Sequence, residues 1–296
     1  MKADATAQPW LPPGPAMLFC PADRPDRYGK AAERSDVVII DLEDAVAPAD
    51  KPAAREALVA HPLDPASTIV RLNPFDSGEF EADLEALAKT QYRCVMLAKA
   101  ESAGQVEQVP VGVLALVETP LGVVRADEIA AVSNCVGLMW GAEDLVAAMG
   151  GDASRFAAMT SATGSPMMGQ YRDAPRYARA RVAMAAAAFG RFAVDAVHLD
   201  IADHDGLRVE ADDAVALGFM ATACIHPGQV PVIRDAYAPT PEEVSRAERI
   251  VSAARNEAGV FQLDGRMVDA PVISLAHSVL RRAQATGTTT IGVDHD

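Results

Sequence analysis

The sequence predicts a (β/α)8 barrel followed by a C-terminal helical extension. Eight short apolar runs, bounded by polar, glycine or proline residues, have the form of parallel strands that are buried on both faces. Segments with apolar residues at helical spacing separate them, and every connection is too long for a hairpin. The length of 296 residues suits one such barrel with an extension. A doubly wound open sheet is the alternative.

The elements alternate along the chain as this fold requires. Strands are expected at residues 17–21, 37–42, 68–73, 94–99, 112–118, 137–141, 196–201 and 221–226. Helices, rich in good helix formers, are expected at residues 25–35, 50–61, 79–90, 102–109, 125–134 and 175–192. The longest interval between strands, residues 145–195, is expected to contain a long loop.

The chain divides into three parts. Residues 1–16 are rich in proline and read as a flexible arm, and residues 17–238 form the barrel domain. Residues 239–296 form the extension, a lid or an oligomer arm. Its first helix is expected to begin with Thr240 as its cap and Pro241 at its first position, and a turn and a final helix follow.

Composition limits the classes of function. The chain has 41 acidic and 26 basic residues, a formal net charge of −15, which argues against nucleic acid or an anionic membrane as the main partner. No apolar run reaches the roughly 18 residues that a membrane span needs. The four cysteines lie in or beside expected strands without CxxC spacing, as buried reduced thiols do. We therefore expect a cytoplasmic protein.

Polar residues gather at the carboxyl ends of the expected strands. In a (β/α)8 barrel the active site lies at these ends and draws on several strands at once. The residues are Glu43, Asp44, Arg71, Asn73, Lys99, Glu101, Glu118, Asp144 and His226. We expect them to share one mouth.

Glu118 and Asp144 are candidates for a magnesium site. They follow adjacent expected strands, and Mg²⁺ commonly takes one or two protein carboxylates, several waters and the substrate. Zinc is not favoured, because the histidines show neither HxH nor HExxH spacing. The alternative is that each carboxylate pairs with an arginine or caps the next helix, as Asp144 could do in GAEDLVAAMG.

The basic strand-end residues leave several chemistries open. Arg71 could hold a carboxylate or a developing oxyanion through its planar fork, or form a structural salt bridge with Glu43 or Asp44. Lys99 suggests a Schiff-base aldolase, which needs a desolvated lysine, but its polar neighbours in AKAES favour an ion-paired positioning role. His226, before a Pro-Gly turn, is expected to be a hydrogen-bonded packing residue.

Arg24, Arg27 and Lys30 form a basic cluster after the first expected strand of an acidic chain. Such a cluster suits an anionic ligand tail such as a phosphate. From the spacing alone, a solvated helix face is the preferred interpretation.

Eight motifs, in order, resemble the citrate lyase β-subunit-like family of CoA-ester lyases, which includes malyl-CoA and citramalyl-CoA lyases. They are LFCPADRPDRYGKA, DVVIIDLEDAVAPADKPAAREAL, VRLN, LAKAES, LALVETPLGV, MWGAEDL, CIHPGQV and GRMVDAPV, and the match runs in order from about Leu18 to Arg282. Two positions depart from the family pattern, Ala98 in place of proline and Pro120 in place of alanine or serine. Neither removes an expected ligand, although Pro120 stiffens the loop beside the expected metal.

The resemblance implies roles for the strand-end residues. The family's Mg²⁺ ligands match Glu118 and Asp144, and its substrate arginine matches Arg71. We also expect Glu43 and Asp44 to contact the substrate in the same mouth.

The resemblance also implies how subunits and CoA come together. The family is usually trimeric, and its C-terminal aspartate matches Asp269, which would then lie over the site of a neighbouring subunit. Basic residues after the first strand hold the CoA phosphates in the family, so Arg24, Arg27 and Lys30 are expected to bind CoA.

The expected activity is a reversible Claisen-type cleavage of a 3-hydroxyacyl-CoA, of malyl-, citramalyl- or citryl-CoA type, to acetyl-CoA and a 2-oxo acid. Mg²⁺ would polarise the carbonyl of the 2-oxo acid, Arg71 would stabilise the enolate oxygen, and Asp269 would exchange a proton with the acetyl methyl group. Two alternatives stay open. One is a citrate lyase β-subunit that acts on an acyl-carrier-protein thioester, and the other is a non-catalytic CoA-ester-binding protein.

Overall fold

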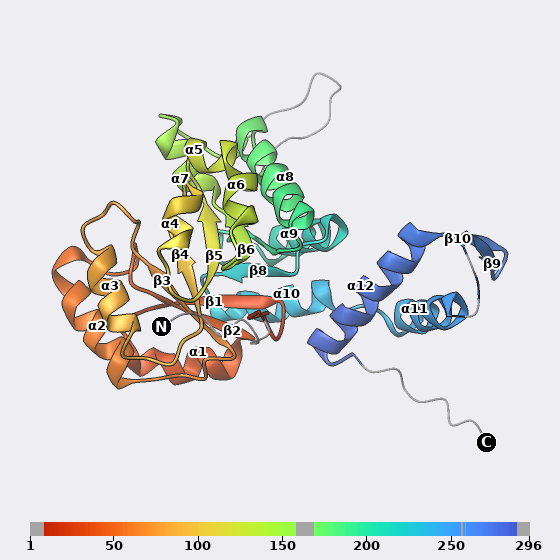
Figure 1. Ribbon diagram of the computed structural model, residues 1–296, viewed down its shortest axis with the longest axis horizontal. Coiled ribbons are helices and arrows are strands. Elements are labelled where there is room, and N and C mark those ends of the chain that lie inside the picture. Colours follow the sequence, from red (N-terminus) through yellow and green to blue (C-terminus); the bar gives the residue numbers. More distant parts are fainter. Residues whose placement is uncertain (1–8, 158–168, 256, 258, 289–296) are drawn as a thin grey trace.

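Eight parallel strands form a closed barrel in chain order, with β8 paired to β1 (Figure 1). The computed structural model describes residues 9–157, 169–255, 257 and 259–288. The strands are β1 Ala16–Pro21, β2 Val37–Asp41, β3 Thr68–Leu72, β4 Cys94–Leu97, β5 Gly112–Val117, β6 Cys135–Trp140, β7 Phe192–Asp195 and β8 Ala221–Cys224. The predicted (β/α)8 fold is confirmed, and the open-sheet alternative is wrong because β1 and β8 leave no edge.

Helices follow the strands and cover the outside of the barrel (Figure 1). The α-helices are α1 Tyr28–Arg34, α2 Lys51–Ala60, α3 Phe80–Leu87, α4 Ala103–Glu107, α5 Pro120–Val124, α6 Ala126–Ala131, α7 Ala142–Ala148, α8 Asp173–Ala188, α9 His204–Leu217 and α10 Val230–Tyr237. Short 3-10 helices are η1 Pro25–Arg27, η2 Pro48–Asp50 and η3 Pro227–Gln229. The sequence patterns did not predict α5, α9 or α10.

Local sequence explains where several of these helices begin and end. Ser102 and Gln105 form a reciprocal capping box at the start of α4. Thr119 caps α5, and Pro120 occupies the first helical position, where no backbone donor is needed. Gly218 ends α9 with φ of 89°, a left-handed conformation that glycine adopts without a Cβ penalty.

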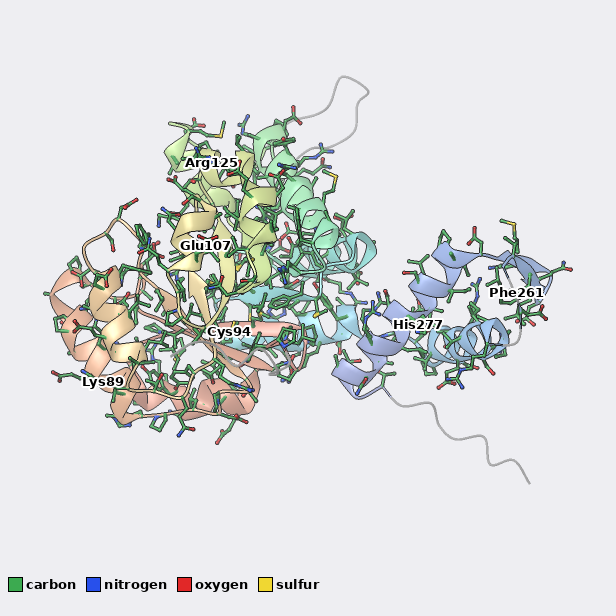
Figure 2. The ribbon with its side chains drawn as sticks, in the orientation of Figure 1. Lys89, Cys94, Glu107, Arg125, Phe261 and His277 are labelled. Carbon is green, nitrogen blue, oxygen red and sulfur yellow. The ribbon has the colours of Figure 1, made fainter. Side chains whose placement is uncertain are left out.

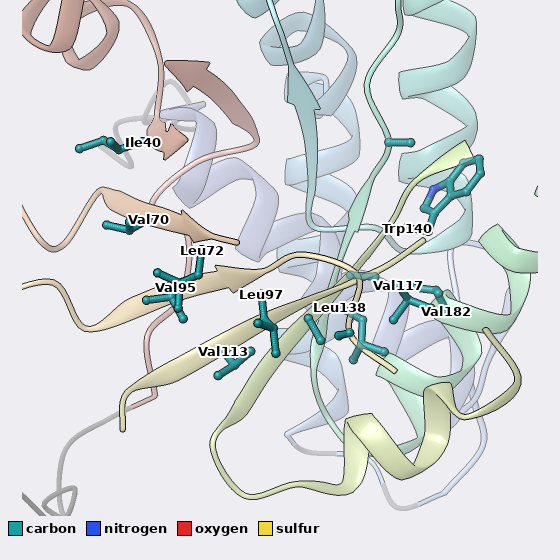
Figure 3. Close-up of a cluster of buried hydrophobic side chains, with 14 of the residues drawn as sticks. Ile40, Val70, Leu72, Val95, Leu97, Val113, Val117, Leu138, Trp140 and Val182 are labelled. Carbon is teal, nitrogen blue, oxygen red and sulfur yellow. The ribbon is translucent and has the colours of Figure 1, made fainter. Parts of the chain in front are cut away.

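Strand side chains alternate between two buried clusters. The smaller cluster consists almost entirely of alternate strand residues and fills the barrel, as Met17, Ile39, Ile69, Met96, Leu116 and Met139 do. The larger cluster combines the other strand residues with helix residues, so it lies between the strands and the helices. Figure 3 shows this outer layer, with Ile40, Val70, Leu97 and Val113 on strands and Val182 on α8. The alternation therefore decides which residues reach the barrel axis.

The seventh strand was predicted at residues 196–201, and this position is wrong. β7 spans Phe192–Asp195, and Phe192 is the register partner of Gly137 of β6, where an added Cβ would lie 2.5 Å from the Phe192 ring. Apolar residues recur through both ranges, interrupted by Asp195, His198 and Asp200, so periodicity alone could not fix the strand ends. Residues 196–201 form a loop instead, in which Leu199 is 52% exposed.

The predicted long loop lies partly on residues 158–168, outside the described residues. On either side of that range, Arg155 and Tyr171 pair as an isolated antiparallel bridge. The Arg155 guanidinium also lies over the Tyr171 ring, 3.7 Å from its centroid. Backbone hydrogen bonds from Phe156 to Gln170 and from Arg172 to Ser154 also join the two described ends of the loop.

The N-terminal segment is packed where the structure describes it. Trp10 is 7% exposed, its ring centroid lies 6.1 Å from that of Phe192, and its Nε1 donates to the Pro65 carbonyl over 3.2 Å. Within residues 9–16, this tryptophan thus packs against one end of the barrel interior. The division into an arm and a barrel domain stays a prediction. Residues 1–8 of the predicted arm lie outside the described residues.

The C-terminal extension projects from the barrel beyond α10 (Figure 1). It consists of α11 Pro241–Ala254, the antiparallel pair β9 Phe261–Leu263 and β10 Arg266–Val268, and α12 Ala270–Thr286. Thr240 caps α11 in a capping box with Glu243, as predicted for Thr240. The extension has its own small cluster, which includes Ile250, Val268 and Ala276. Whether barrel and extension are separate domains stays a prediction.

Two predictions from composition can be compared with the structure. In the part of the chain that is described, no helix combines the length and hydropathy that crossing a membrane requires. All four cysteines are buried and free, as predicted. Burial raises the pKa of Cys20 and of Cys135 to about 11, so these thiols are poor nucleophiles at neutral pH.

Candidate active site at the barrel mouth

Three charged residues sit at the top of the barrel interior because of strand alternation. Asp41 ends β2, Arg71 lies next to the end of β3, and Glu118 directly follows β5. Each comes two residues after a strand residue of the interior cluster. All three therefore point to the mouth, where we predicted the shared site.

Asp41 holds Arg71 through two parallel hydrogen bonds. Arg71 Nε and Nη2 donate to the two carboxylate oxygens over 2.7 and 2.6 Å. Burial disfavours the guanidinium charge, but the Asp41 bonds and the nearby Glu43 and Glu118 charges outweigh it, so the pKa of Arg71 is raised. Arg71 Nη1 lies 2.8 Å from Glu43. The alternative of a salt bridge between Arg71 and Glu43 is thus observed. Arg71 also has a stronger partner, Asp41, which was not among the expected site residues.

Glu43 joins the two cations of the mouth. One of its carboxylate oxygens faces Arg71, and the other accepts from Lys99 Nζ over 2.5 Å. The residue is 4% exposed. Burial raises its pKa, although Arg71 and Lys99 act in the opposite direction. Charges therefore alternate across the mouth from Asp41 to Lys99.

Lys99 has an unusual backbone conformation. Its φ is 51°, in the left-handed region that costs an L-residue other than glycine about 1–2 kcal/mol. Its N–H donates to Glu118 Oε1 over 3.2 Å, and its Nζ lies 3.2 Å from Asp144 Oδ1. The predicted ion pairing of Lys99 is confirmed. A Schiff-base lysine needs a lowered pKa, whereas the carboxylates, Glu43 first, raise that of Lys99 despite burial.

Glu118 is a buried carboxylate at the centre of the site. It is 3% exposed, and burial, together with the charge of Asp144, raises its pKa to about 8. A Cβ at Gly141 would lie 2.7 Å from Glu118 Oε2, so only glycine leaves room for this carboxylate. A cation beside Glu118 would favour its charged form.

Asp144 lies in the first turn of α7, and its side chain is 37% exposed. The N-cap position of α7 is occupied by Gly141 rather than Asp144, so the capping alternative for Asp144 is not observed. Its neighbour Glu143 accepts instead from Ser154 Oγ over 2.5 Å. Glu118 and Asp144 both lie within 4 Å of Lys99 Nζ, which places the two predicted metal ligands around one point.

The remaining strand-end residues differ in their surroundings. Asp44 is 64% exposed at its side chain and lies 3.9 Å from Lys99. Glu101 donates its backbone N–H to Gln105. His226 is exposed, and its Nδ1 accepts from a backbone N–H within η3 over 3.1 Å. The predicted hydrogen bond of His226 is therefore present, but as a helix cap on the surface.

A buried hydrogen-bond network holds the residues that follow β2. Lys51 Nζ donates to the carbonyls of Leu42 and Glu43 and to Asn73 Oδ1 over 2.7–2.9 Å. Asn73 in turn donates to Asp83 over 2.8 Å. Asn73, expected at the mouth from its position at a strand end, lies in this network instead. The local signal that could have indicated this buried network is Lys51, which directly precedes a helix proline in DKPAAR.

The basic cluster follows β1 at the mouth end of the barrel. Arg24 and Arg27 lie in or beside η1 and Lys30 in α1, and all three are exposed. Arg24 has one acidic neighbour, Asp23, at 3.7 Å. The cluster is thus open to a ligand.

Asp269 is the predicted site residue that the single chain does not bring to the mouth. It caps α12 by accepting from the Val272 N–H over 3.2 Å, and β10 and the start of α12 lie away from the barrel (Figure 1). A cavity of about 390 Å³ near Met267 and Ile250 also lies on the extension. It contains none of the predicted site residues, so the charged mouth is the better candidate site.

The mouth suits a magnesium ion better than a metal held entirely by protein. Within the described residues, no group of three or more His, Cys, Asp or Glu side chains is arranged to hold a metal. Mg²⁺ needs only one or two carboxylates when waters and substrate oxygens complete its octahedron. Glu118, buried with its place kept open by Gly141, and the partly exposed Asp144 fit this requirement.

Comparison with known proteins decides the family. The model of a family described as HpcH/HpaI aldolase/citrate lyase matches residues 15–227, the barrel. The chain belongs to this family. The family relationship predicted from the motifs is confirmed.

Named relatives extend the similarity over nearly the whole chain. The chain is 55% identical over 271 residues to a citrate lyase subunit beta-like protein of Mycobacterium tuberculosis, covering 91% of this chain and 96% of that one. It is 35% identical to citrate lyase subunit beta of Escherichia coli, covering 86% and 87%. It is 28% identical to the mitochondrial citramalyl-CoA lyase of Rattus norvegicus, covering 92% and 86%.

The same similarity appears in a solved structure. The fold resembles that of CitE from Mycobacterium tuberculosis in complex with magnesium, acetoacetate and coenzyme A. The TM-score is 0.79 at 55% identity, covering 91% of this chain and 98% of that one. The similarity therefore includes the extension as well as the barrel.

Proposed function

We propose that the protein is a Mg²⁺-dependent CoA-ester lyase that reversibly cleaves a 3-hydroxyacyl-CoA to acetyl-CoA and a 2-oxo acid. A carbon–carbon lyase is what its family membership indicates. The observation that carries the proposal is the meeting of Glu118, Asp144 and Arg71 at one mouth. A relative at 55% identity holds magnesium, acetoacetate and coenzyme A.

Glu118 and Asp144 are the proposed magnesium ligands. The bound ion would act as a Lewis acid on the carbonyl of the 2-oxo acid. Glu118 presents a buried carboxylate whose position Gly141 and the Lys99 N–H define. Asp144 completes the pair from the more open side, where waters and substrate enter.

Arg71 is the proposed stabiliser of the enolate oxygen. A guanidinium has five N–H donors, and Asp41 accepts from two of them. The remaining N–H groups of Arg71 lie toward Glu43 and the mouth. A developing oxyanion there can accept hydrogen bonds from them. Glu43, with the more exposed Asp44, forms the proposed acidic wall of the substrate site.

Asp269 is the proposed base, supplied in trans by a neighbouring subunit of a trimer. The position of β10 and α12 on the projecting extension supports a role outside the chain's own mouth. In condensation its carboxylate takes a proton from the acetyl methyl group, and in cleavage it returns one. Arg24, Arg27 and Lys30, exposed after β1, are proposed to bind the CoA phosphates.

The second candidate is a citrate lyase β-subunit that acts on an acyl-carrier-protein thioester. The 35% identity to the Escherichia coli subunit favours it. The same site residues would serve both reactions, so only the thioester carrier differs. A non-catalytic CoA-ester-binding protein would need no complete set of Glu118, Asp144 and Arg71. The cytoplasmic location stays a prediction.

Substrate screening tests the proposal. The purified chain should cleave malyl-CoA, citramalyl-CoA or citryl-CoA only when Mg²⁺ is present, with acetyl-CoA and the 2-oxo acid measured as products. Glu118→Gln and Asp144→Asn should abolish this turnover and keep the barrel folded, while Glu107→Gln on the outer surface of α4 (Figure 2) should not change it. Turnover of the carrier-protein thioester alone would favour the second candidate, and no turnover of either would contradict both.

A further inference from the structure

The ammonium of Lys99 occupies the centre of the acidic mouth. Its Nζ lies 2.5 Å from Glu43, 3.2 Å from Asp144, and 3.9 Å from both Asp44 and Glu118. Two of these four carboxylates are the proposed magnesium ligands, and the other two are not. Lys99 is thus placed between two pairs of acceptors.

The backbone of Lys99 is shaped to put it there. Continued β alternation from β4 would direct residue 99 outward with Leu97, which belongs to the outer cluster. The left-handed φ of 51° interrupts this alternation, and the backbone N–H and the ammonium both reach carboxylates of the mouth. A lysine has no local side-chain bond that would favour this conformation, so tertiary contacts must hold it. The surrounding carboxylates provide those contacts.

We propose that Lys99 is an internal counter-ion that competes with the divalent cation for Glu118 and Asp144. It balances these carboxylates when no metal is bound, and it withdraws to Glu43 and Asp44 when the metal binds. The proposal rests on the metal site of the proposed function. Lys99 is in this view a positioning residue that sets metal affinity.

Electrostatics gives the direction of the effect. An ammonium and a divalent cation that share the same oxygens repel each other. The site is partly shielded from water, and charges interact more strongly there than in bulk solvent. The shortest contact, to Glu43, is to a carboxylate outside the proposed metal pair. Lys99 therefore has an acceptor that it can keep after the metal enters. Removing the ammonium removes the competitor and the repulsion together.

Calorimetric titration of the full chain with Mg²⁺, without substrate, tests the proposal. Lys99→Met should bind Mg²⁺ at least about tenfold more tightly than the wild type. Lys89→Met is the matched control, because Lys89 is an exposed lysine two residues after α3 (Figure 2). The Mg²⁺ affinity of this variant should equal that of the wild type. Lys99→Gln, a second neutral variant, should agree with Lys99→Met. Unchanged or weaker binding in the folded neutral variants would overturn the proposal.

A second measurement uses Glu43, the acceptor to which Lys99 withdraws. Glu43→Gln should weaken Mg²⁺ binding, because Lys99 then stays with Glu118 and Asp144. The weakening should be larger in the wild-type background than in the Lys99→Met background. Equal weakening in both backgrounds would show that Lys99 does not move between the two pairs, and would overturn the proposal.

The two levels of inference fail in different ways. Suppose Glu118→Gln loses Mg²⁺ binding while Lys99→Met binds like the wild type: the counter-ion role is then wrong and the metal site stands. Suppose instead that neither substitution changes Mg²⁺ binding: the metal site of the proposed function is then wrong, and the counter-ion role with it.

Discussion

Asp41 and Arg71 are partners in the register of β2 and β3, and their side chains form a doubly hydrogen-bonded ion pair at 2.6 and 2.7 Å. The pair is nearly buried, with side-chain exposures of 2% and 11%. It fixes the plane of the guanidinium before any substrate arrives. An orientation fixed in this way is what stabilisation of a developing oxyanion requires.

Loss of the Arg71 fork should be costly for catalysis. We expect Arg71→Lys to lower kcat by roughly 10²–10³, because an ammonium cannot donate to Asp41 and to an oxyanion in one plane. Steady-state kinetics with the cleaved CoA ester measures this effect. A fully active Arg71→Lys variant would show that charge alone is needed and would remove the enolate role.

Asp41 should matter through Arg71. We expect Asp41→Asn to lower kcat by roughly tenfold or more with little change in KM, because Arg71 stays but loses its orientation. The substitution should add little to the loss when it is combined with Arg71→Lys, since both act on one interaction. Fully additive losses would show that Asp41 acts independently of Arg71.

Removal of the basic cluster should weaken CoA binding selectively. We expect the triple change of Arg24, Arg27 and Lys30 to alanine to raise KM for the CoA ester at least about tenfold, with kcat nearly unchanged. The corresponding pantetheine thioester, which lacks the nucleotide phosphates, should show no such change. Lys89→Ala is the control for loss of one exposed positive charge. An equal rise in KM for both thioesters would contradict phosphate binding by the cluster.

Complementation should show whether Asp269 acts in trans. Asp269→Ala and Glu118→Ala should each be inactive, and mixing them should restore part of the activity. Some sites of the hybrid trimers would then combine an intact metal centre with an intact Asp269. Native mass spectrometry checks that the subunits exchange. If they exchange and the mixture stays inactive, Asp269 serves only as the observed cap of α12.

His198 should make stability depend on pH. Its Nδ1 lies 2.9 Å from Glu210, which also pairs with Arg155, and its Nε2 lies 3.3 Å from Asp203. The Glu210 hydrogen bond raises the pKa of His198 above its ordinary 6.5, against burial. The His198 and Arg155 bonds lower the pKa of Glu210 below 4.5, also against burial.

These directions fix the pH window. The contribution of His198 is complete below pH 6.5 and is lost as pH rises through the raised folded pKa. The contribution of Glu210 is complete above pH 4.5 and is lost as pH falls through its lowered pKa. Thermal unfolding should therefore show that Tm falls more above pH 6.5 in the wild type than in His198→Gln. Parallel pH profiles of the two proteins would contradict this assignment.

The sequence by itself determined the barrel and the strand ends that contribute to its mouth. Fully buried parallel strands need continuous apolar runs, and a carboxylate or guanidinium at the end of such a run must reach the mouth or find a partner charge. For this reason Arg71, Glu118 and Asp144 could be chosen from the pattern before their neighbours were known. Their chemical roles came from the motif resemblance.

Tertiary structure decided which charges meet. Arg71 pairs with Asp41, 30 residues away in sequence, and Lys99 pairs with Glu43, 56 residues away. In the sequence pattern, several strand-end carboxylates were equally suitable partners for each of these cations. Phe192 of β7 fills the space beside Gly137 of β6. Lys99, in a left-handed conformation, contacts the carboxylates of Glu118 and Glu43 from other parts of the barrel. Local pattern records which residues are buried, whereas pairing between distant residues depends on strand register and on which opposite charge lies nearest once the barrel has closed.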